Sequence, residues 1–139
     1  MQILPNKIND NKVFDEWIEV KKELNSTQKY PHITEGEVWW CGIGKNVGVE
    51  INGKSEKFSR PVLVFRKLSS TGFLAIPLST QIHNGSWYAQ FTFRGIKQVA
   101  ALSQIRVTSV FRLYERIGEL SKNDFALVKD GFKKLYIAK

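Results

Sequence analysis

The chain has 139 residues, of which 42% are hydrophobic and 12% aromatic, which is enough for one hydrophobic core and makes two independent domains unexpected. No run approaches the roughly 18 apolar residues that a membrane span needs, and residues 1–12 are too polar for a signal peptide, so we expect a soluble, cytoplasmic protein. The single cysteine, Cys41, excludes an internal disulfide and a thiolate metal cluster within one chain, and we expect a buried, inert thiol.

The net charge of +8 has its excess in the middle of the chain. Residues 1–34 carry five basic and five acidic side chains, whereas residues 42–112 carry ten basic side chains against only Glu50 and Glu56. A basic surface that serves only solubility is one interpretation. The phosphate backbone of a nucleic acid is the partner that this balance favours.

Residues 1–34 predict a helix followed by a connector. Asn9-Asp10-Asn11 offers N-cap oxygens, and apolar side chains then recur at steps of three and four residues as far as Leu24. Pro31 indicates an extended link after the helix. We expect residues 1–34 to be an appended extension and residues 35–139 to be the main domain. The helix should pack on that domain or on a second protomer through Phe14, Trp17 and Leu24.

From residue 37 onward the hydrophobic period becomes that of β-strands. Alternation along residues 87–94 predicts that Trp87, Ala89, Phe91 and Phe93 point into the core. The other predicted strands cover residues 37–41, 61–65, 73–78, 99–102, 105–108 and 116–120, with a hairpin turn at 69–72.

The chain is predicted to end in a helix. Ser109 is a candidate cap for a single helical turn, and Ser121 with Asp124 predicts the start of the C-terminal helix. Many short strands with helices at both ends indicate a mainly β fold, most simply a small and strongly curved barrel. The buried stripe of the last helix is expected to be Phe125, Val128, Phe132 and Leu135.

Arg60 is the first candidate for chemistry. It follows a long, glycine-rich loop of residues 42–59, and loops of that length are usually functional or disordered. Pro61 stiffens the entrance of the next strand, and a guanidinium held there can clamp a phosphate through two parallel hydrogen bonds. An ordinary surface arginine is the alternative.

Ser79 and Thr80 end a predicted strand, and either hydroxyl could donate to a phosphoryl oxygen or simply belong to a turn. Glu50 could accept a proton near Arg60, or form a salt bridge that orients it. His83 and His32 fall in a turn and a linker, and we expect both to be bystanders. No pair of histidines or carboxylates has metal-ligand spacing, so we expect neither metal nor cofactor.

Six segments in this order resemble the MazF/PemK family of toxins, over about residues 35–136. Each segment is weak alone, but six in register are difficult to obtain by chance. They are Glu35-Gly36-Glu37-Val38-Trp39-Trp40, Gly48-Val49-Glu50, Arg60-Pro61-Val62-Leu63-Val64, Ile76-Pro77-Leu78-Ser79-Thr80-Gln81-Ile82, Ser103-Gln104-Ile105-Arg106 and Arg116-Ile117-Gly118-Glu119-Leu120.

The resemblance implies an SH3-like barrel, a two-fold homodimer and the toxin of a type II toxin-antitoxin system. It implies sequence-specific cleavage of single-stranded RNA without a metal, by attack of the ribose 2′-OH, and an acidic antitoxin that blocks the RNA groove. Carried over, the catalytic positions fall on Arg60, Ser79 and Glu50. We expect RNA contacts from the loop and the strand ends, at Gly48, Lys54, Lys57, Thr80, Gln81 and Arg106.

This sequence departs from the family pattern in three places. Serine stands at position 79, where the family commonly has threonine; it keeps the hydroxyl and loses the methyl group that restricts its rotamer. The extension of residues 1–34 and the extra loop residues 54–57 are additions. Two alternatives share the fold: a CcdB-type toxin that binds a topoisomerase, and a relative that binds RNA or antitoxin without cleaving.

Overall fold

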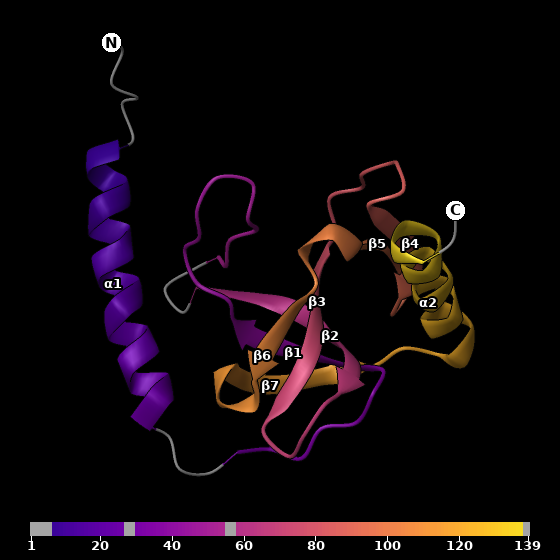
Figure 1. Cartoon of the computed structure of the whole chain (residues 1–139), viewed down its shortest axis with the longest axis horizontal. Helices are drawn as coiled ribbons and strands as arrows, with labels where there is room; N and C mark the ends of the chain where they lie inside the picture. Colours follow the sequence, from indigo (N-terminus) through magenta and orange to yellow (C-terminus); the bar gives the residue numbers. More distant parts are fainter. Residues whose placement is uncertain (1–6, 27–29, 55–57, 138–139) are drawn as a thin grey trace.

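The computed structural model describes residues 7–26, 30–54 and 58–137 of the chain, with the side chains of residues 7–10 and 26 left undescribed. Figure 1 shows a curved sheet with one long helix at each side. In chain order the elements are α1 (Lys7–Ser26), β1 (Glu37–Gly42), β2 (Ser59–Lys67), β3 (Gly72–Ser79), β4 (Tyr88–Phe93), β5 (Ile96–Ala101), the 3-10 turn η1 (Leu102–Gln104), β6 (Arg106–Ser109), the 3-10 turn η2 (Val110–Arg112), β7 (Leu113–Glu119) and α2 (Lys122–Tyr136).

The seven strands form one antiparallel sheet in the order β4-β5-β3-β2-β1-β7, with β6 paired to β3 beside this path. The sheet curls until its ends approach: a Cβ on Gly118 of β7 would lie 3.1 Å from the Phe93 ring of β4, and Arg94 donates a hydrogen bond to Ile117 O. Within the described residues no backbone ladder joins β4 to β7. The predicted fold class, mainly β with terminal helices, is therefore confirmed, as a strongly curved but open sheet.

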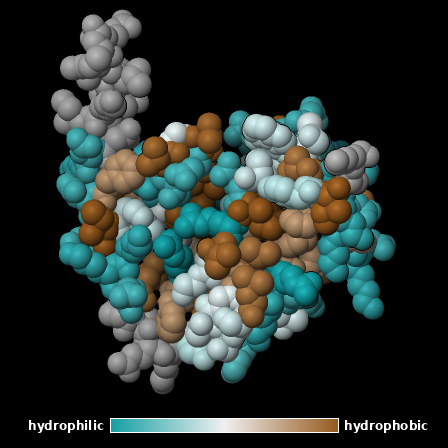
Figure 2. Space-filling model, viewed as in Figure 1, coloured by the Kyte–Doolittle hydropathy of each residue, from teal (hydrophilic) through white to brown (hydrophobic). Residues whose placement is uncertain are grey.

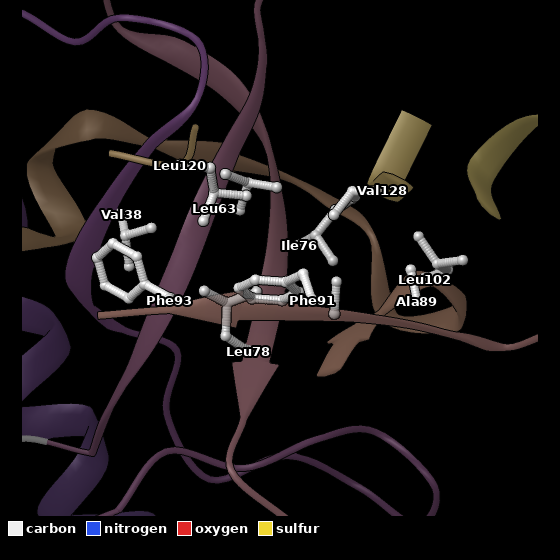
Figure 3. Packing of buried hydrophobic residues seen from close by; sticks show 11 residues of the cluster. Val38, Leu63, Ile76, Leu78, Ala89, Phe91, Phe93, Leu102, Leu120 and Val128 are labelled. Carbon is white, nitrogen blue, oxygen red and sulfur yellow. The ribbon is translucent and has the colours of Figure 1, made fainter. Parts of the chain in front are cut away.

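The central strands are buried on both faces. Along β2, Leu63 packs into one cluster of buried side chains while its neighbours Val62 and Val64 pack into another. This double burial explains why β2 and β3 are almost continuously apolar in sequence instead of alternating. Figure 3 shows the first cluster, in which Phe91 of β4 lies near Leu78 of β3, and Phe93 of β4 near Val38 of β1.

Helix α2 begins and packs as its sequence predicts. The Ser121 hydroxyl caps it, accepting a hydrogen bond from the Asp124 N–H at 3.1 Å and donating one to the Asp124 carboxylate at 2.8 Å. Val128 is fully buried, and the other predicted members of its stripe pack around the first core cluster. The predicted turn after Ser109 is η2, whose Phe111 N–H donates to the Ser109 hydroxyl.

Helix α1 packs on the sheet through Trp17. Its indole is only 6% exposed and lies against Gly44 and against the ring of Phe58, 5.7 Å away between centroids. Leu24 reaches Gly42 at the end of β1. These contacts follow the expected apolar face. The predicted start was wrong, because α1 begins at Lys7, so residues 9–11 are the third to fifth residues of the helix and not its cap. No described helix is long and apolar enough to cross a bilayer.

The inward orientation predicted for Trp87 was wrong. Ala89, Phe91 and Phe93 are buried, but Trp87 is 60% exposed. A turn precedes β4, closed by a hydrogen bond from the Tyr88 N–H to Gly85 O, so the strand begins one residue after Trp87. The alternation of side chains therefore does not extend to this tryptophan.

Cys41 lies on β1 and is completely buried in the second core cluster. Burial raises the pKa of its thiol to about 12. The thiol is therefore protonated at neutral pH and withdrawn from solvent, as expected for an inert cysteine.

Glu37 ties the start of β1 to β7 and to the linker. Its carboxylate accepts hydrogen bonds from Arg116 Nε at 2.6 Å, from the Thr34 N–H at 2.6 Å and from the Trp39 indole at 3.3 Å. Burial alone raises the pKa of this carboxyl, but the hydrogen bonds outweigh burial and leave the pKa of Glu37 below its usual value. The charged form is thus the one that the fold stabilises.

Replacing Glu37 with glutamine is expected to destabilise the protein most at neutral pH. Because its folded-state pKa is depressed, the carboxylate stabilises the fold fully above the unfolded-state pKa of about 4.3, and that contribution is lost as the pH falls through the folded-state value. The difference in melting temperature between wild type and Glu37→Gln should therefore shrink below about pH 4. The exposed Glu119→Gln should show little difference at any pH, and a pH-independent effect of Glu37→Gln would contradict this account.

Candidate functional site

Arg60 and Ser79 come together through the pairing of β2 with β3. The register places Val62 opposite Pro77, and Leu63 opposite Ile76. If the same register continues for two more residues, toward the start of β2 and the end of β3, Arg60 lies opposite Ser79. The observed hydrogen bond from Arg60 Nη1 to the carbonyl oxygen of Leu78, at 3.4 Å, agrees with this placement.

The Arg60 guanidinium is held by backbone carbonyl groups on two sides. Nε donates to Asn52 O at 2.9 Å, from the loop between β1 and β2, and Nη1 donates to Leu78 O. Burial lowers the pKa of Arg60, yet a guanidinium stays charged at any physiological pH. Two of its five N–H groups are engaged in these bonds, and the guanidinium still borders the cavities described below.

Ser79 is half-buried at the end of β3. Its hydroxyl oxygen accepts a hydrogen bond from the Gln81 N–H at 3.1 Å, which fixes the turn that follows the strand. A hydroxyl that accepts one bond still carries its own hydrogen. Ser79 is therefore a turn residue, as one interpretation of the sequence held, and it also keeps a donor for an anionic ligand.

Two cavities meet at this pair. Arg60 and Ser79 line both of them, so the two side chains stand on the wall that the cavities share. The larger cavity, about 510 Å³, is further lined by Trp40, Lys54, Ser59, Pro61, Leu78, Thr80, Gln98, Tyr114 and Glu115. The smaller cavity, about 210 Å³, is further lined by Val49, Ile51, Gln81, His83, Tyr88, Ala101 and Gln104.

Glu50 lies apart from both cavities, in the exposed part of the loop between β1 and β2. Its carboxylate accepts a hydrogen bond from the Val47 N–H at 2.9 Å, which closes a tight turn around Gly48. Gln104 of η1 then ties the loop down, since its amide accepts from the Ile51 N–H at 3.1 Å and donates to Val49 O at 3.0 Å. This loop therefore has a defined path beside the smaller cavity.

The other residues expected to contact RNA are divided between several places. Lys54 and Thr80 line the larger cavity, and Gln81 lines the smaller one. Gly48 is exposed in the loop, with a φ of +59°. Arg106 lies on β6 opposite Ala75 and borders neither cavity. Lys57 belongs to residues 55–57, outside the described residues.

Several residues of the site carried no signal in the sequence. Trp40, on β1, is 39% exposed in the larger cavity, and the strand register sets it opposite Glu115 of β7. Tyr114 and Gln98 enter the same cavity from β7 and β5. These residues come together only because long-range pairing brings their strands into one sheet. A local sequence pattern does not reveal that pairing.

The donor set offers little to a metal ion. In the part of the chain that the structure describes, no three or more histidine, cysteine, aspartate or glutamate side chains gather as metal ligands would. What the site does offer is a guanidinium, a hydroxyl and aromatic walls. Such a set can bind a phosphodiester and stack a base beside it.

Known proteins resemble this chain in sequence pattern and in fold. A family model described as a PemK-like, MazF-like toxin of type II toxin-antitoxin system matches residues 34–136. The fold is similar to MazF (Form-I) from Deinococcus radiodurans, at 19% identity and a TM-score of 0.57, over 78% of this chain and 97% of that one. It is also similar to an endoribonuclease from Mycobacterial species, at 11% identity and a TM-score of 0.58, over 77% and 93%.

Another similar structure, an endoribonuclease in complex with its cognate antitoxin from Mycobacterial species, has 13% identity and a TM-score of 0.57, over 73% of this chain and 92% of that one. Identities this low establish a common fold only. Among curated proteins, none matches the chain. The family model, which spans most of the sequence, establishes more: this chain belongs to the PemK-like, MazF-like toxins of type II toxin-antitoxin systems.

Proposed function

We propose that this toxin is a metal-independent endoribonuclease that cleaves single-stranded RNA at specific short sequences. The observation that carries the proposal is the meeting of the Arg60 guanidinium and the Ser79 hydroxyl on the wall between two cavities. A scissile phosphate bound there would have room for one nucleotide on either side. The description of two structural neighbours as endoribonucleases supports the same activity.

In the proposed reaction the ribose 2′-oxygen attacks the adjacent phosphorus and the bond from phosphorus to the 5′-oxygen breaks. The products are a 2′,3′-cyclic phosphate, or the 3′-phosphate formed from it by water, and a 5′-hydroxyl end. Negative charge grows on the equatorial oxygens of the phosphorane, where Arg60 and Ser79 would donate hydrogen bonds. Donors of this kind are worth on the order of 3 kcal/mol each when they are already oriented.

The larger cavity is suited to a base that is splayed out of a single strand. Trp40 and Tyr114 offer aromatic surfaces, and base stacking on such rings is worth about 1–3 kcal/mol per base. Lys54 and Thr80 would contact the neighbouring backbone, and Gln81 the nucleotide in the smaller cavity. Gly48 and Arg106 are proposed as more distant RNA contacts, and Lys57 as a further one. The role of Glu50 as activator of the nucleophile stays a prediction, and its place outside both cavities does not support it.

We also propose the partners that the family resemblance implies: an acidic antitoxin and a second copy of the chain, in the cytoplasm. The basic excess of residues 42–112 suits both RNA and an acidic antitoxin.

Figure 2 shows patches of apolar surface, in brown, within the polar surface between the two helices. Val49 and Val107, which are 92% and 67% exposed, are apolar side chains that such a partner could cover. The division into residues 1–34 and 35–139 stays a prediction.

The test is incubation of the purified protein with a mixed RNA in excess EDTA. Cleavage should continue, and the new 5′ ends should accept a label from polynucleotide kinase without prior phosphatase treatment, because they carry a hydroxyl. Mapping these ends should give one short sequence motif. RNA that stays intact but is bound by the protein would support the non-cleaving alternative and end the nuclease proposal.

A further inference from the structure

His83 occupies a place that its sequence position did not predict. It follows β3 in the turn of residues 80–87 and was expected to be a bystander. In the structure its half-buried imidazole lines the smaller cavity, together with Arg60 and Ser79. A histidine thus borders the same space as the two groups proposed to hold the scissile phosphate.

The imidazole is held in a defined orientation by Tyr88. The two rings are stacked, with centroids 4.7 Å apart and an interplanar angle of 17°. Tyr88 is the first residue of β4, whose backbone is paired along its whole length with β5. Stacking on a residue of the sheet restricts the rotamers of the imidazole before substrate binds. Such preorganisation favours catalysis by a group that must accept a proton from one particular atom.

Other candidates for proton transfer are placed less well. Glu50 borders neither cavity, and its carboxylate accepts the Val47 N–H. Glu115 borders only the larger cavity, opposite Trp40, in an exposed position. Besides His83, the ionisable groups that line the smaller cavity are the Arg60 guanidinium and the Tyr88 phenol. Neither of these accepts a proton readily at neutral pH.

We propose that His83 is the general base that takes the proton of the ribose 2′-OH, a role that rests on the nuclease function proposed above. As the 2′-oxygen forms its bond to phosphorus, the proton moves to the free ring nitrogen of neutral imidazole. The bond from phosphorus to the 5′-oxygen breaks, and the leaving oxygen takes a proton from solvent water. The imidazolium returns its proton to solvent, so histidine is unchanged after each turnover.

The experiment measures kcat and KM for one RNA oligonucleotide as a function of pH, in EDTA. Wild-type kcat/KM should rise with pH through the range of about 5–8, in which histidine changes its charge. His83→Gln keeps the size and polarity of the side chain but cannot act as a base near neutrality. It should lower kcat by about 10²–10⁴-fold, remove the rise with pH, and leave the affinity for an uncleavable 2′-deoxy substrate unchanged.

His32 supplies a matched control, because it is the other histidine of the chain and is exposed in the linker. His32→Gln should retain the wild-type rate and pH profile. Tyr88→Ala should lower kcat and keep the rise with pH, because it releases the ring without removing the base. If His83→Gln folds poorly, His83→Ala assayed with added imidazole replaces it, and activity should return with the concentration of neutral imidazole.

The possible failures are distinct. If the wild type does not cleave RNA, the nuclease function is wrong and the role of His83 falls with it. If the wild type cleaves and His83→Gln retains its rate and its pH profile, the function stands and the role of His83 is wrong. Loss of the pH dependence in Glu50→Gln or Glu115→Gln, with His83→Gln active, would assign the base to that carboxylate instead.

Discussion

Replacing Arg60 with alanine is expected to lower kcat/KM for RNA cleavage by about 10²–10³-fold, the loss measured when one oriented donor to a transition-state oxyanion is removed. The reason lies in how the guanidinium is held. Two backbone carbonyl groups fix its orientation, through Nε to Asn52 O and Nη1 to Leu78 O, before any substrate arrives. Stabilisation of the phosphorane then needs no reorganisation of the side chain.

Arg60→Lys should recover little of this activity. A lysine keeps the positive charge but presents a single ammonium group, which cannot bond to Asn52 and Leu78 and also clamp a phosphate through two parallel hydrogen bonds. Ser79→Ala should also be slow. The double variant should be less impaired than the product of the two single effects, because both groups act on the same phosphorane.

Arg66 is a suitable control, since it is an exposed arginine on the same strand, β2. Arg66→Ala should cleave at the wild-type rate. Circular dichroism and melting should show that Arg60→Ala remains folded. Equal rates for Arg60→Ala and wild type would remove Arg60 from the reaction, whatever the activity of the protein.

The pairing of Arg60 with Ser79 shows which features the sequence predicts well, and which features it does not predict. The hairpin of β2 and β3 was predicted from two apolar runs and a turn at residues 69–72. Near that turn the register pairs Lys67 with Phe73, but a bulge between Val64 and Arg66 shifts it by one residue. Without the bulge Arg60 would stand opposite Thr80. Whether the Ser79 or the Thr80 hydroxyl lies opposite Arg60 therefore depends on the bulge in β2, which the sequence pattern does not predict.

The cavities were beyond prediction for a related reason. Trp40, Gln98 and Tyr114 lie on three different strands, and each looks like an ordinary strand residue in its own neighbourhood. Only the long-range order of the sheet brings them together. His83 shows the same limit, because the local sequence of a polar turn does not indicate that its histidine will line a cavity together with Arg60. Local periodicity predicts elements, whereas the composition of a site depends on pairing between elements.

Removing the Trp17 side chain is expected to be the most destabilising single truncation in the extension. Trp17 is 6% exposed, packs on the Phe58 ring, and has the Arg112 guanidinium over its own ring at 5.7 Å. Truncation of a buried aromatic side chain costs about 3–5 kcal/mol. Chemical denaturation of Trp17→Ala should show a loss of this size, and Trp87→Ala, which removes an exposed tryptophan, should show almost none.

Gly44 tests the same contact from the other side. Its φ of +86° favours glycine, and an added Cβ would lie 2.3 Å from the Trp17 ring. Gly44→Ala should therefore destabilise the protein through both backbone strain and a clash. Combined with Trp17→Ala the clash disappears, so the double variant should be more stable than the sum of the two single losses implies.

The contact also links the added helix to the candidate site. Phe58, against which Trp17 packs, has a φ of +51°, and its carbonyl oxygen accepts the N–H groups of Ile43 and Gly44 at 3.1 Å each. Arg60 follows two residues later. Helix α1 thus supports the base of the loop from which Asn52 O orients the guanidinium. Trp17→Ala should lower kcat/KM less than Arg60→Ala does, and a chain without residues 1–26 that is as stable, soluble and active as the full protein would contradict this role.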